Sequence, residues 1–261
     1  MELEGKVALV TGGGSGIGRA AALRLAREGC AVGVLGRSRE KAEAVAAEIR
    51  RTGGRAAALA ADVAVEGEVE RATADLAREF GRLDFVFANA GVNSVWAPID
   101  EIAPAEWDRT VATNLRGAFL TLHYAVPHLK RAGGGAVVIT ASVNGTRNFS
   151  NAGATAYSCT KAAQVAMAKM LALELAKFRI RVNVVCPGAI RTEIGESTTR
   201  RDTAVAGEPA DYPRGKIPLT DGEPGAAEEV AELVAFLLSD RARHITGTPV
   251  WIDGAESLLI G

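Results

Sequence analysis

The sequence predicts an α/β protein built on one doubly wound parallel sheet, with crossover helices on both faces. Short runs rich in Val, Ile and Leu alternate with longer Ala-rich stretches of helical period, which is the pattern of βαβ units. The short runs are apolar throughout rather than at every second residue, which indicates strands buried on both faces. A glycine-rich turn at residues 11–18, TGGGSGIG, joins the first run to the first helical stretch. Together these features predict a single-domain fold of the Rossmann type.

Each run and stretch is assigned to an element in chain order. The apolar runs are expected to form the strands Val7–Val10, Ala31–Leu35, Ala56–Ala60, Phe85–Ala88, Val137–Thr140, Val182–Cys186 and Pro249–Ile252. The stretches between them are expected to form the helices Gly16–Glu28, Arg39–Arg51, Glu66–Phe80, Pro104–Lys130, Ala156–Phe178 and Ala226–Ser239. A glycine just past the end of four helices suits a left-handed C-terminal cap, at Gly29, Gly53, Gly81 and Gly133.

One segment departs from the alternation. Residues 191–225 are polar and rich in Gly, Pro and Thr. Long irregular segments on a rigid scaffold frequently cover a functional site. We therefore expect a mobile lid over a site, within a single domain that spans residues 1–261.

Composition excludes several classes of function. Lys and Arg total 30 against 31 for Asp and Glu, so no excess of positive charge is present to bind nucleic acid or an acidic membrane surface. The three cysteines are far apart and the three histidines are scattered, which argues against a disulfide framework and a metal site. The first residues are acidic rather than basic, and no apolar run approaches the roughly 18 to 20 residues that span a bilayer. We expect a cytoplasmic protein that acts on a small molecule.

The glycine-rich loop has the position of an anion site. A helix that starts directly after a glycine turn offers unpaired N–H groups and a positive dipole end, and the glycines let the backbone approach a pyrophosphate. The same loop could be a plain tight turn, but its place after the first strand of a βαβ pattern favours a dinucleotide. Gly13–Ala20 nearly fits the phosphate loop of nucleoside triphosphatases, yet Arg19 and Ala20 replace the lysine and hydroxyl that this loop requires.

Tyr157 and Lys161 form a candidate proton-transfer pair. They lie four residues apart on an expected helix, so both side chains share one face. An adjacent ammonium stabilises a phenolate and lowers the pKa of tyrosine from about 10, which suits proton exchange with an alcohol or carbonyl oxygen. A core tyrosine beside a lysine with a buried stem would give the same spacing. The pair alone therefore does not decide the chemistry.

Taken together, the motifs resemble those of the short-chain dehydrogenase/reductase family. They occur in the family's order, with TGGGSGIG at 11–18, ANAG at 88–91, Asn114, Ser142, YSCTK at 157–161 and PGAIRT at 187–192. The resemblance implies hydride transfer between a nicotinamide dinucleotide and an alcohol or carbonyl carbon. It also implies that Tyr157 exchanges the proton and that Lys161 lowers its pKa and holds the nicotinamide ribose. Ser142 would hydrogen-bond the substrate oxygen, and Asn114 would organise a water in the proton relay.

The resemblance further implies where the cofactor lies. Asp62 and Val63 would meet the adenine, although Asp62 could equally cap a helix. Residues 89–91 would border the cofactor, and residues 187–192 would meet the carboxamide. The full set of expected cofactor contacts is Gly12, Ser15, Gly16, Ile17, Gly18, Arg37, Asp62, Val63, Asn89, Ala90, Gly91, Tyr157, Lys161, Pro187, Gly188, Ile190 and Thr192.

The end of the second expected strand indicates which dinucleotide is used. A protein that reads the unphosphorylated ribose needs a carboxylate about 20 residues after the glycine loop, but no Asp or Glu occurs between Gly29 and Arg39. Arg37 stands there instead, and a guanidinium pairs with a 2′-phosphate. NADP(H) is therefore favoured over NAD(H). Two readings oppose it, since Arg37 could simply be solvated and Ser15 occupies a place where many NADP-using relatives carry a second basic residue.

Besides Ala88, a minor change where the family often has Asn, two departures from the family pattern are visible. The interval from Ser142 to Tyr157 is slightly longer than usual, within residues 144–151, beside the expected substrate pocket. Ala255 stands where a second glycine commonly follows the WIDG motif. The first departure weakens any borrowed substrate assignment.

The expected function is a ketone or 3-oxoacyl thioester reductase. The same residues would serve a sugar, polyol or secondary-alcohol dehydrogenase, and a dinucleotide-sensing protein without turnover is a third reading. The apolar faces of the expected helices Pro104–Lys130 and Ala156–Phe178 could pack across subunits, and the resemblance implies a homotetramer.

Overall fold

Seven parallel strands form one sheet in the computed structural model, which describes residues 2–208, 210–213 and 215–260. The strand order is β3-β2-β1-β4-β6-β7-β9, so the direction of winding reverses between β1 and β4. This reversal opens a crevice at the carboxyl ends of the strands, where doubly wound folds bind ligands. The predicted parallel sheet is confirmed, with β1 (Val7–Thr11), β2 (Ala31–Gly36), β3 (Ala56–Ala60), β4 (Phe85–Ala88), β6 (Gly135–Thr140), β7 (Ile180–Pro187) and β9 (Pro249–Ile252).

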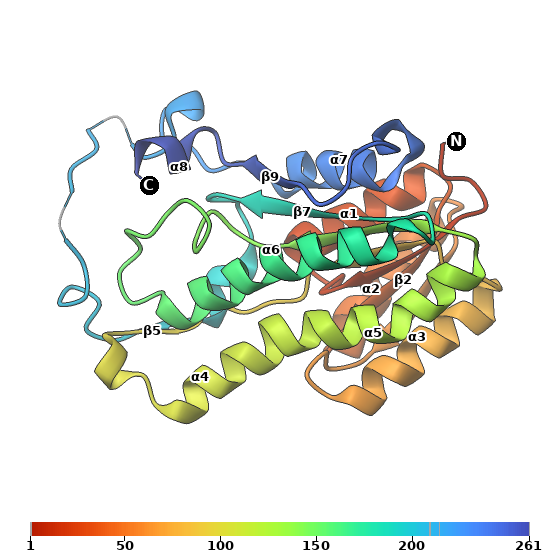
Figure 1. Cartoon of the computed structure of the whole chain (residues 1–261), viewed down its shortest axis with the longest axis horizontal. Helices are drawn as coiled ribbons and strands as arrows, with labels where there is room; N and C mark the ends of the chain where they lie inside the picture. Colours follow the sequence, from red (N-terminus) through yellow and green to blue (C-terminus); the bar gives the residue numbers. More distant parts are fainter. Residues whose placement is uncertain (1, 209, 214, 261) are drawn as a thin grey trace.

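Helices cover both faces of the sheet, as predicted (Figure 1). One apolar layer contains residues of α1, α2 and α7, and the other contains residues of α3, α5 and α6. In β1, Ala8 and Val10 belong to the first layer while Val7 and Leu9 belong to the second, which explains why the strand is apolar throughout. The principal helices are α1 (Gly16–Arg27), α2 (Arg39–Arg51), α3 (Glu66–Phe80), α4 (Pro104–Val111), α5 (Gly117–Arg131), α6 (Thr155–Ala176) and α7 (Ala227–Leu238). None of the helices in the described part of the chain has the length and hydropathy that a bilayer span requires.

The helix ends follow the glycine signals. Gly29, Gly53, Gly81 and Gly133 have φ values of +88°, +84°, +79° and +86°, so the four left-handed caps are confirmed. The helix expected over Pro104–Lys130 is not uniform, because a π-helical turn at Ala112–Arg116 separates α4 from α5. A π-turn inserts extra backbone into the helix and is common at functional sites.

A second, two-stranded parallel sheet was not predicted. It pairs β5 (Ser94–Trp96) with β8 (Thr198–Arg200), and β8 lies within the segment expected to form a lid. Three-residue strands carry too little periodicity to be recognised in a sequence. Short helices also went unpredicted, namely the 3-10 turns Ile99–Glu101, Glu193–Ser197, Pro218–Thr220 and Asp240–Ala242 and the helix α8 (Glu256–Leu259).

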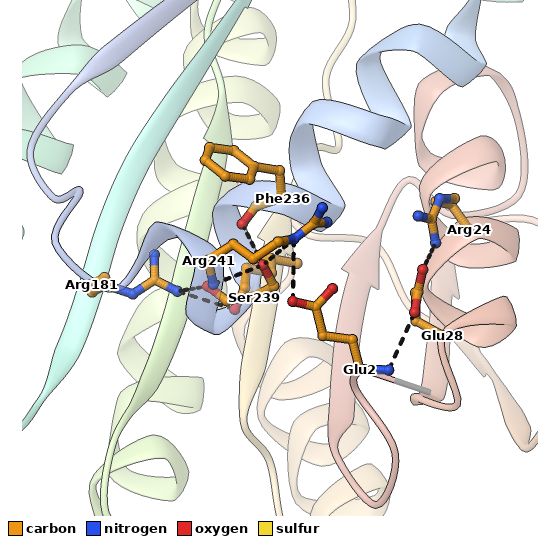
Figure 2. A network of polar contacts seen from close by, with 8 residues as sticks. Glu2, Arg24, Glu28, Arg181, Phe236, Ser239 and Arg241 are labelled. Carbon is orange, nitrogen blue, oxygen red and sulfur yellow. Dashed lines mark hydrogen bonds and ion pairs between the residues drawn. The ribbon is translucent and has the colours of Figure 1, made fainter.

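Polar contacts tie the chain together at the amino edge of the sheet (Figure 2). The Arg181 guanidinium donates to the carbonyl oxygens of Leu237, Leu238 and Ser239 at 2.6, 3.1 and 2.9 Å, so a cation stabilises the C-terminal end of α7. Nearby, Glu2 pairs with Arg241 at 3.2 Å. A cavity of about 520 Å³ opens at this edge, but none of the predicted site residues lines it. The candidate active site lies at the opposite edge.

Candidate active site

A second cavity of about 520 Å³ lies at the carboxyl ends of β1 to β4. Its walls come from the glycine loop, the end of β2, the start of α2 and the loops after β3 and β4. This is the crevice formed by the reversal of the strand order. The lining residues are Gly12, Gly14, Ser15, Leu35, Gly36, Arg37, Ser38, Lys41, Ala61, Asp62, Val63, Ala90, Gly91, Val92 and Thr113.

Close packing explains two of the glycines in the loop. A Cβ on Gly12, whose φ is +65°, would lie 3.0 Å from the Asn89 Nδ2 atom and 3.1 Å from the Ala90 Cα atom. A Cβ on Gly18 would lie 2.1 Å from the Gly12 carbonyl oxygen, where α1 starts against the loop. Only glycine allows this approach. The loop is therefore fixed against the ANAG segment after β4.

Asn89 joins the ends of three strands. Its side chain donates to the Thr11 carbonyl oxygen at 3.2 Å and accepts from the Thr140 hydroxyl at 3.1 Å. The Thr11 hydroxyl in turn accepts from the backbone N–H groups of Asn89 and Ala90. The predicted residues after β4 thus lie beside the glycine loop and hold it in place.

The loop and the start of α1 fit a pyrophosphate. Ser15 precedes α1 in an extended conformation without a side-chain cap, and the first turn, which includes Gly16, Ile17 and Gly18, holds no acidic residue. The first N–H groups of the helix are therefore available to an anion. At the end of β2, a Cβ on Gly36 would meet nothing within 4 Å, which leaves room for a ribose.

Arg37 and Lys41 supply positive charge to the same cavity. Both side chains are exposed, and neither makes an ion pair within the described part of the chain. A Cβ on Gly14 would lie 3.0 Å from the Lys41 Cβ atom, so the lysine stem passes against the glycine loop. Lys41 was missed in the sequence, although its place in the first turn of a helix that follows β2 could have indicated it.

The two residues expected to meet the adenine lie after β3. The Asp62 carboxylate accepts the N–H of Ala64 at 2.9 Å, and the N–H of Asp62 donates to the Glu68 carboxylate at 2.8 Å, so Asp62 fixes the entry to α3. Val63 is buried, and a Cβ on Gly117 would lie 2.7 Å from its Cγ2 atom. Both line the cavity.

Tyr157, Ser142 and Lys161 lie together at the end of β6 and the start of α6. All three are buried, with exposed fractions of 7%, 7% and 2%. The Ser142 hydroxyl acts on the phenol and lowers its pKa, and the Lys161 Nζ atom lies 5.5 Å from the centroid of the Tyr157 ring. The Lys161 ammonium donates to the Thr140 carbonyl oxygen at 2.7 Å.

Burial dominates the titration of this pair. It raises the pKa of Tyr157 to about 12, against a smaller lowering by the Ser142 hydroxyl, and it lowers the pKa of Lys161 to about 8. The sequence argument expected the ammonium to lower the pKa of the phenol. Burial outweighs that effect and raises the pKa of the phenol, because loss of hydration disfavours the charged form of each group.

Asn114 lies within the π-turn and is fully buried. The Asn114 side chain accepts the N–H of Val92 at 2.9 Å and donates to the Val92 carbonyl oxygen at 3.0 Å. The backbone carbonyl oxygen of Asn114 accepts from the Gln164 side chain at 2.7 Å. A Cβ on Gly91 would lie 3.3 Å from the Asn114 Oδ1 atom and 3.5 Å from the Lys161 Nζ atom. Asn114 and Gly91 are thus brought to Lys161, and Gln164 is a neighbour that the sequence did not indicate.

The segment after β7 closes the crevice from the other side. The N–H of Gly188 donates to the Ile252 carbonyl oxygen at 3.1 Å, and Ile190 forms a bridge with Gly225. A Cβ on Gly16 would lie 3.1 Å from the Thr192 Cβ atom. The segment that starts with Pro187 therefore reaches the glycine loop.

Two tryptophans with contacts in this region were also missed, Trp96 beside Tyr157 and Trp251 beside the interval that follows Ser142. The Trp96 ring lies 6.4 Å from the Tyr157 ring between centroids, and the Arg200 guanidinium lies 5.2 Å from the Trp96 ring centroid. In the longer interval after Ser142, the Arg147 guanidinium lies 3.6 Å from the Trp251 ring centroid. These contacts join segments distant in sequence, so no local pattern reveals them.

The fold is that of a dinucleotide-binding α/β protein, and similarity to dehydrogenases and reductases defines an oxidoreductase that uses NAD(P). The family model of the short chain dehydrogenases matches residues 6–203, and the chain belongs to this family. A levodione reductase from Leifsonia aquatica is 37% identical over 97% of this chain and 94% of its own. A cyclohexanol dehydrogenase from an Acinetobacter species is 38% identical over 96% and 94%.

A solved structure is similar over nearly the whole chain. The crystal structure of a 3-ketoacyl-ACP reductase from Sinorhizobium meliloti has a TM-score of 0.94 and 57% identity, and the match covers 97% of this chain and 99% of that chain. The predicted fold class, family and enzyme class are confirmed by these matches.

Proposed function

We propose that the protein is an NADP(H)-dependent reductase of a ketone or a 3-oxoacyl thioester. The observation that carries the proposal is the buried Tyr157 hydroxyl beside Ser142, with Lys161 on the next turn of α6. A phenol with a pKa of about 12 is protonated at neutral pH, so it can donate its proton to a carbonyl oxygen. The names of the levodione and 3-ketoacyl-ACP reductases support the choice of carbonyl substrates.

The chain's residues divide the work of the reduction. The Ser142 hydroxyl orients the substrate oxygen toward Tyr157, which protonates it. Lys161 keeps a positive charge next to the phenol, and its contact with Thr140 holds the ammonium in place. Asn114 fixes the backbone at Val92 beside this group. The bound dinucleotide supplies the hydride, and the protein supplies position and the proton.

The cofactor would be held along the crevice. The glycine loop from Gly12 to Gly18 would receive the pyrophosphate, Asp62 and Val63 the adenine, and residues 89–91 the middle of the molecule. Residues 187–192 would receive the carboxamide, while Lys161 would receive the nicotinamide ribose. The glycine loop, Asp62, Val63, Ala90 and Gly91 are assigned because they line the cavity. Residues 187–192 are assigned because Thr192 packs against Gly16, and Lys161 because it lies next to Gly91.

We propose NADP(H) as the preferred form because Arg37 and Lys41, which form no ion pair with any described residue, provide two cations at the proposed position of the 2′-phosphate. Lys41 approaches the glycine loop from α2 and would take the part of the basic residue that the loop lacks at Ser15. A guanidinium and an ammonium would both be attracted to a phosphate.

Oxidation of a secondary alcohol is the second candidate. The same residues serve both directions, with Tyr157 as acid in one and base in the other, and a relative of similar identity is named a cyclohexanol dehydrogenase. A sugar or polyol would be a more polar substrate of the same kind. An activity panel in both directions separates these cases.

The test of the reaction uses Tyr157→Phe, which keeps the ring and removes the proton. Purified protein is assayed for loss of reduced nicotinamide absorbance with cyclic ketones, open-chain ketones and a 3-oxoacyl thioester. We expect turnover to fall by about 10²- to 10⁴-fold in the variant, while its affinity for NADPH stays within about twofold of the parent. Turnover within about tenfold of the parent would rule out Tyr157 as the proton donor.

The test of the cofactor compares kcat/KM for NADPH and NADH. We expect the parent to prefer NADPH, and we expect the ratio to shrink about tenfold or more in Arg37→Ala because a charge-assisted contact is lost. Arg39→Ala, an exposed neighbour outside the cavity lining, is the matched control. A parent that prefers NADH, or a ratio that Arg37→Ala leaves unchanged, would contradict the assignment.

We further propose a cytoplasmic homotetramer with one domain over 1–261, in which residues 191–225 cover the substrate. The free state of Cys30, Cys159 and Cys186 supports a reducing compartment. Exposed apolar side chains on α5 and α6 support association.

A further inference from the structure

The turn after β9 holds a residue in an unfavourable backbone conformation. Ala255 has φ of +69°, in the left-handed region that favours glycine, at the position where the family commonly has one. Such a conformation persists only where surrounding contacts enforce it, and it is frequent at functional sites. Contacts around the turn must therefore hold Ala255 in this conformation.

Asp253 makes those contacts. One carboxylate oxygen accepts the N–H of Ala255 at 3.2 Å, and the other accepts the N–H of Ser257 at 3.0 Å. The same oxygen also accepts from the Ser257 hydroxyl. One side chain thus holds three donors and fixes the turn.

The turn delivers Glu256 to the segment after β7. Glu256 is 9% exposed, and its Oε2 atom accepts the N–H of Ala189 at 2.8 Å. A Cβ on Gly188 would lie 2.5 Å from this oxygen and 2.7 Å from the Asp253 Cβ atom, so the two segments meet too closely for any side chain at position 188. The glycine of the PGAIRT motif therefore makes room for Glu256 as well as for its own turn.

Burial and the hydrogen bond to Ala189 act on the Glu256 carboxylate more strongly than charged neighbours do. Within the described part of the chain Glu256 forms no ion pair; of the charged groups, Asp253 raises its pKa and Lys216 lowers it. Burial raises the pKa of Glu256. A buried carboxylate without an ion pair costs stability, so this one is expected to have a positional role.

We infer that Glu256 is a positioning residue that sets the backbone of residues 188–190 for the nicotinamide half of the cofactor. The inference rests on the proposed function, which assigns this segment to the carboxamide. By holding the Ala189 N–H, the carboxylate fixes the peptide plane between Gly188 and Ala189. The next peptide is held on its other side, since the Ala189 carbonyl oxygen accepts the N–H of Gly225 at 3.0 Å. The adenosine half of the cavity has no contact with Glu256.

The experiment separates the two halves of the cofactor. Affinities for NADPH and for 2′,5′-ADP, which lacks the nicotinamide, are measured by calorimetry in the parent, Glu256→Ala, Glu256→Gln and the control Glu228→Ala, whose side chain is exposed on α7. We expect Glu256→Ala to lower the affinity for NADPH by about tenfold and to leave the affinity for 2′,5′-ADP within about twofold of the parent. Glu256→Gln keeps an acceptor oxygen and is expected to retain NADPH affinity within about threefold. Equal weakening of both ligands, or weakening of neither, would overturn the inference.

Hydrogen exchange provides a readout that does not depend on the cofactor. We expect the amide of Ala189, followed in a peptide covering 187–192, to exchange faster in Glu256→Ala than in the parent and in Glu256→Gln. If Glu256→Ala fails to fold, Glu256→Asp retains the charge but withdraws the acceptor, and the same loss of NADPH affinity is expected. If the amide of Ala189 exchanged at the parent's rate in both Glu256→Ala and Glu256→Asp, the inference would be overturned. A parent that binds no NADPH would contradict the proposed function, while the exchange experiment still tests the contact.

Discussion

Burial moves the pKa values of Tyr157 and Lys161 in opposite directions, and the order of the two values sets how the site responds to pH. Lys161, with a pKa of about 8, is charged at neutral pH, and Tyr157, with a pKa of about 12, is protonated there. The group that titrates first on raising the pH is therefore the lysine. The acid needed for carbonyl reduction stays protonated throughout the usual range.

We expect kcat/KM for ketone reduction to fall with a single proton as pH rises through about 8, because Lys161 then loses its charge. The affinity for the cofactor should also fall over this pH range, because Lys161 is proposed to hold the nicotinamide ribose. The measurement is a pH profile of kcat/KM under NADPH saturation. In Lys161→Arg, whose guanidinium stays charged, the decline at pH 8 should disappear. A profile that stays flat through alkaline pH in the parent would show that Lys161 does not govern the reaction.

Some site residues follow from sequence at this scale and others do not. The spacing of Tyr157 and Lys161 places both on one face of a helix, and the structure brings them together in the same buried group. Lys41 and Glu256 meet their neighbours Gly14 and Ala189 across long stretches of chain. No local periodicity encodes such contacts, although the place of Lys41 in the first turn of the helix after β2 was a signal that could have indicated this residue.

At the scale of elements, the small β5–β8 sheet determines how the segment 191–225 is held. Trp96 of β5 pairs in register with Arg200 of β8, and the side chain of Asn93 donates to the Thr198 hydroxyl at 2.8 Å. Just after β8, Arg201 pairs with Glu106 of α4 at 3.0 Å. The first part of the segment is thus anchored beside Tyr157 rather than free.

We expect Arg201→Ala to loosen this anchor without unfolding the protein. The pair with Glu106 is partly exposed, so its loss should change global stability little. The KM for the ketone should rise, and thermolysin should cut within 202–225 faster than in the parent. Arg78→Ala, which removes an exposed pair with Asp75 on α3, is the matched control. Equal proteolysis in both variants and the parent would show that the Arg201 contact does not hold the segment.

One predicted element differs from the structure. An unbroken helical period over Pro104–Lys130 predicts one helix, whereas the π-turn at Ala112–Arg116 interrupts it. The insertion brings the Asn114 side chain to the backbone of Val92, a contact made across 22 residues. Tertiary hydrogen bonds rather than propensity decide this departure.

At the scale of the whole molecule, the arrangement was predictable because the strands are buried on both faces. Continuous apolar runs such as Val7–Val10 can satisfy two layers of helices at once, and the alternation of elements then leaves a parallel sheet as the expected arrangement. The surfaces between copies of the chain could not be located from the sequence in this way, because an exposed apolar side chain has the same sequence signature as a buried one.

Two helices present exposed apolar side chains that such a surface between copies would cover. Met170 and Leu173 of α6 are 74% and 85% exposed, and Phe119 of α5, on the same face of the sheet, is 51% exposed. Exposed apolar groups of this size on a helical layer are costly in water and favour association. We expect light scattering to give the mass of four chains for the parent and a smaller assembly for the double variant Met170→Glu, Leu173→Glu, because the introduced charges would be buried without partners. Leu219→Glu, which alters an equally exposed leucine outside these helices, should leave the assembly intact. A parent of monomeric mass, or a double variant that assembles like the parent, would show that α6 does not form the interface.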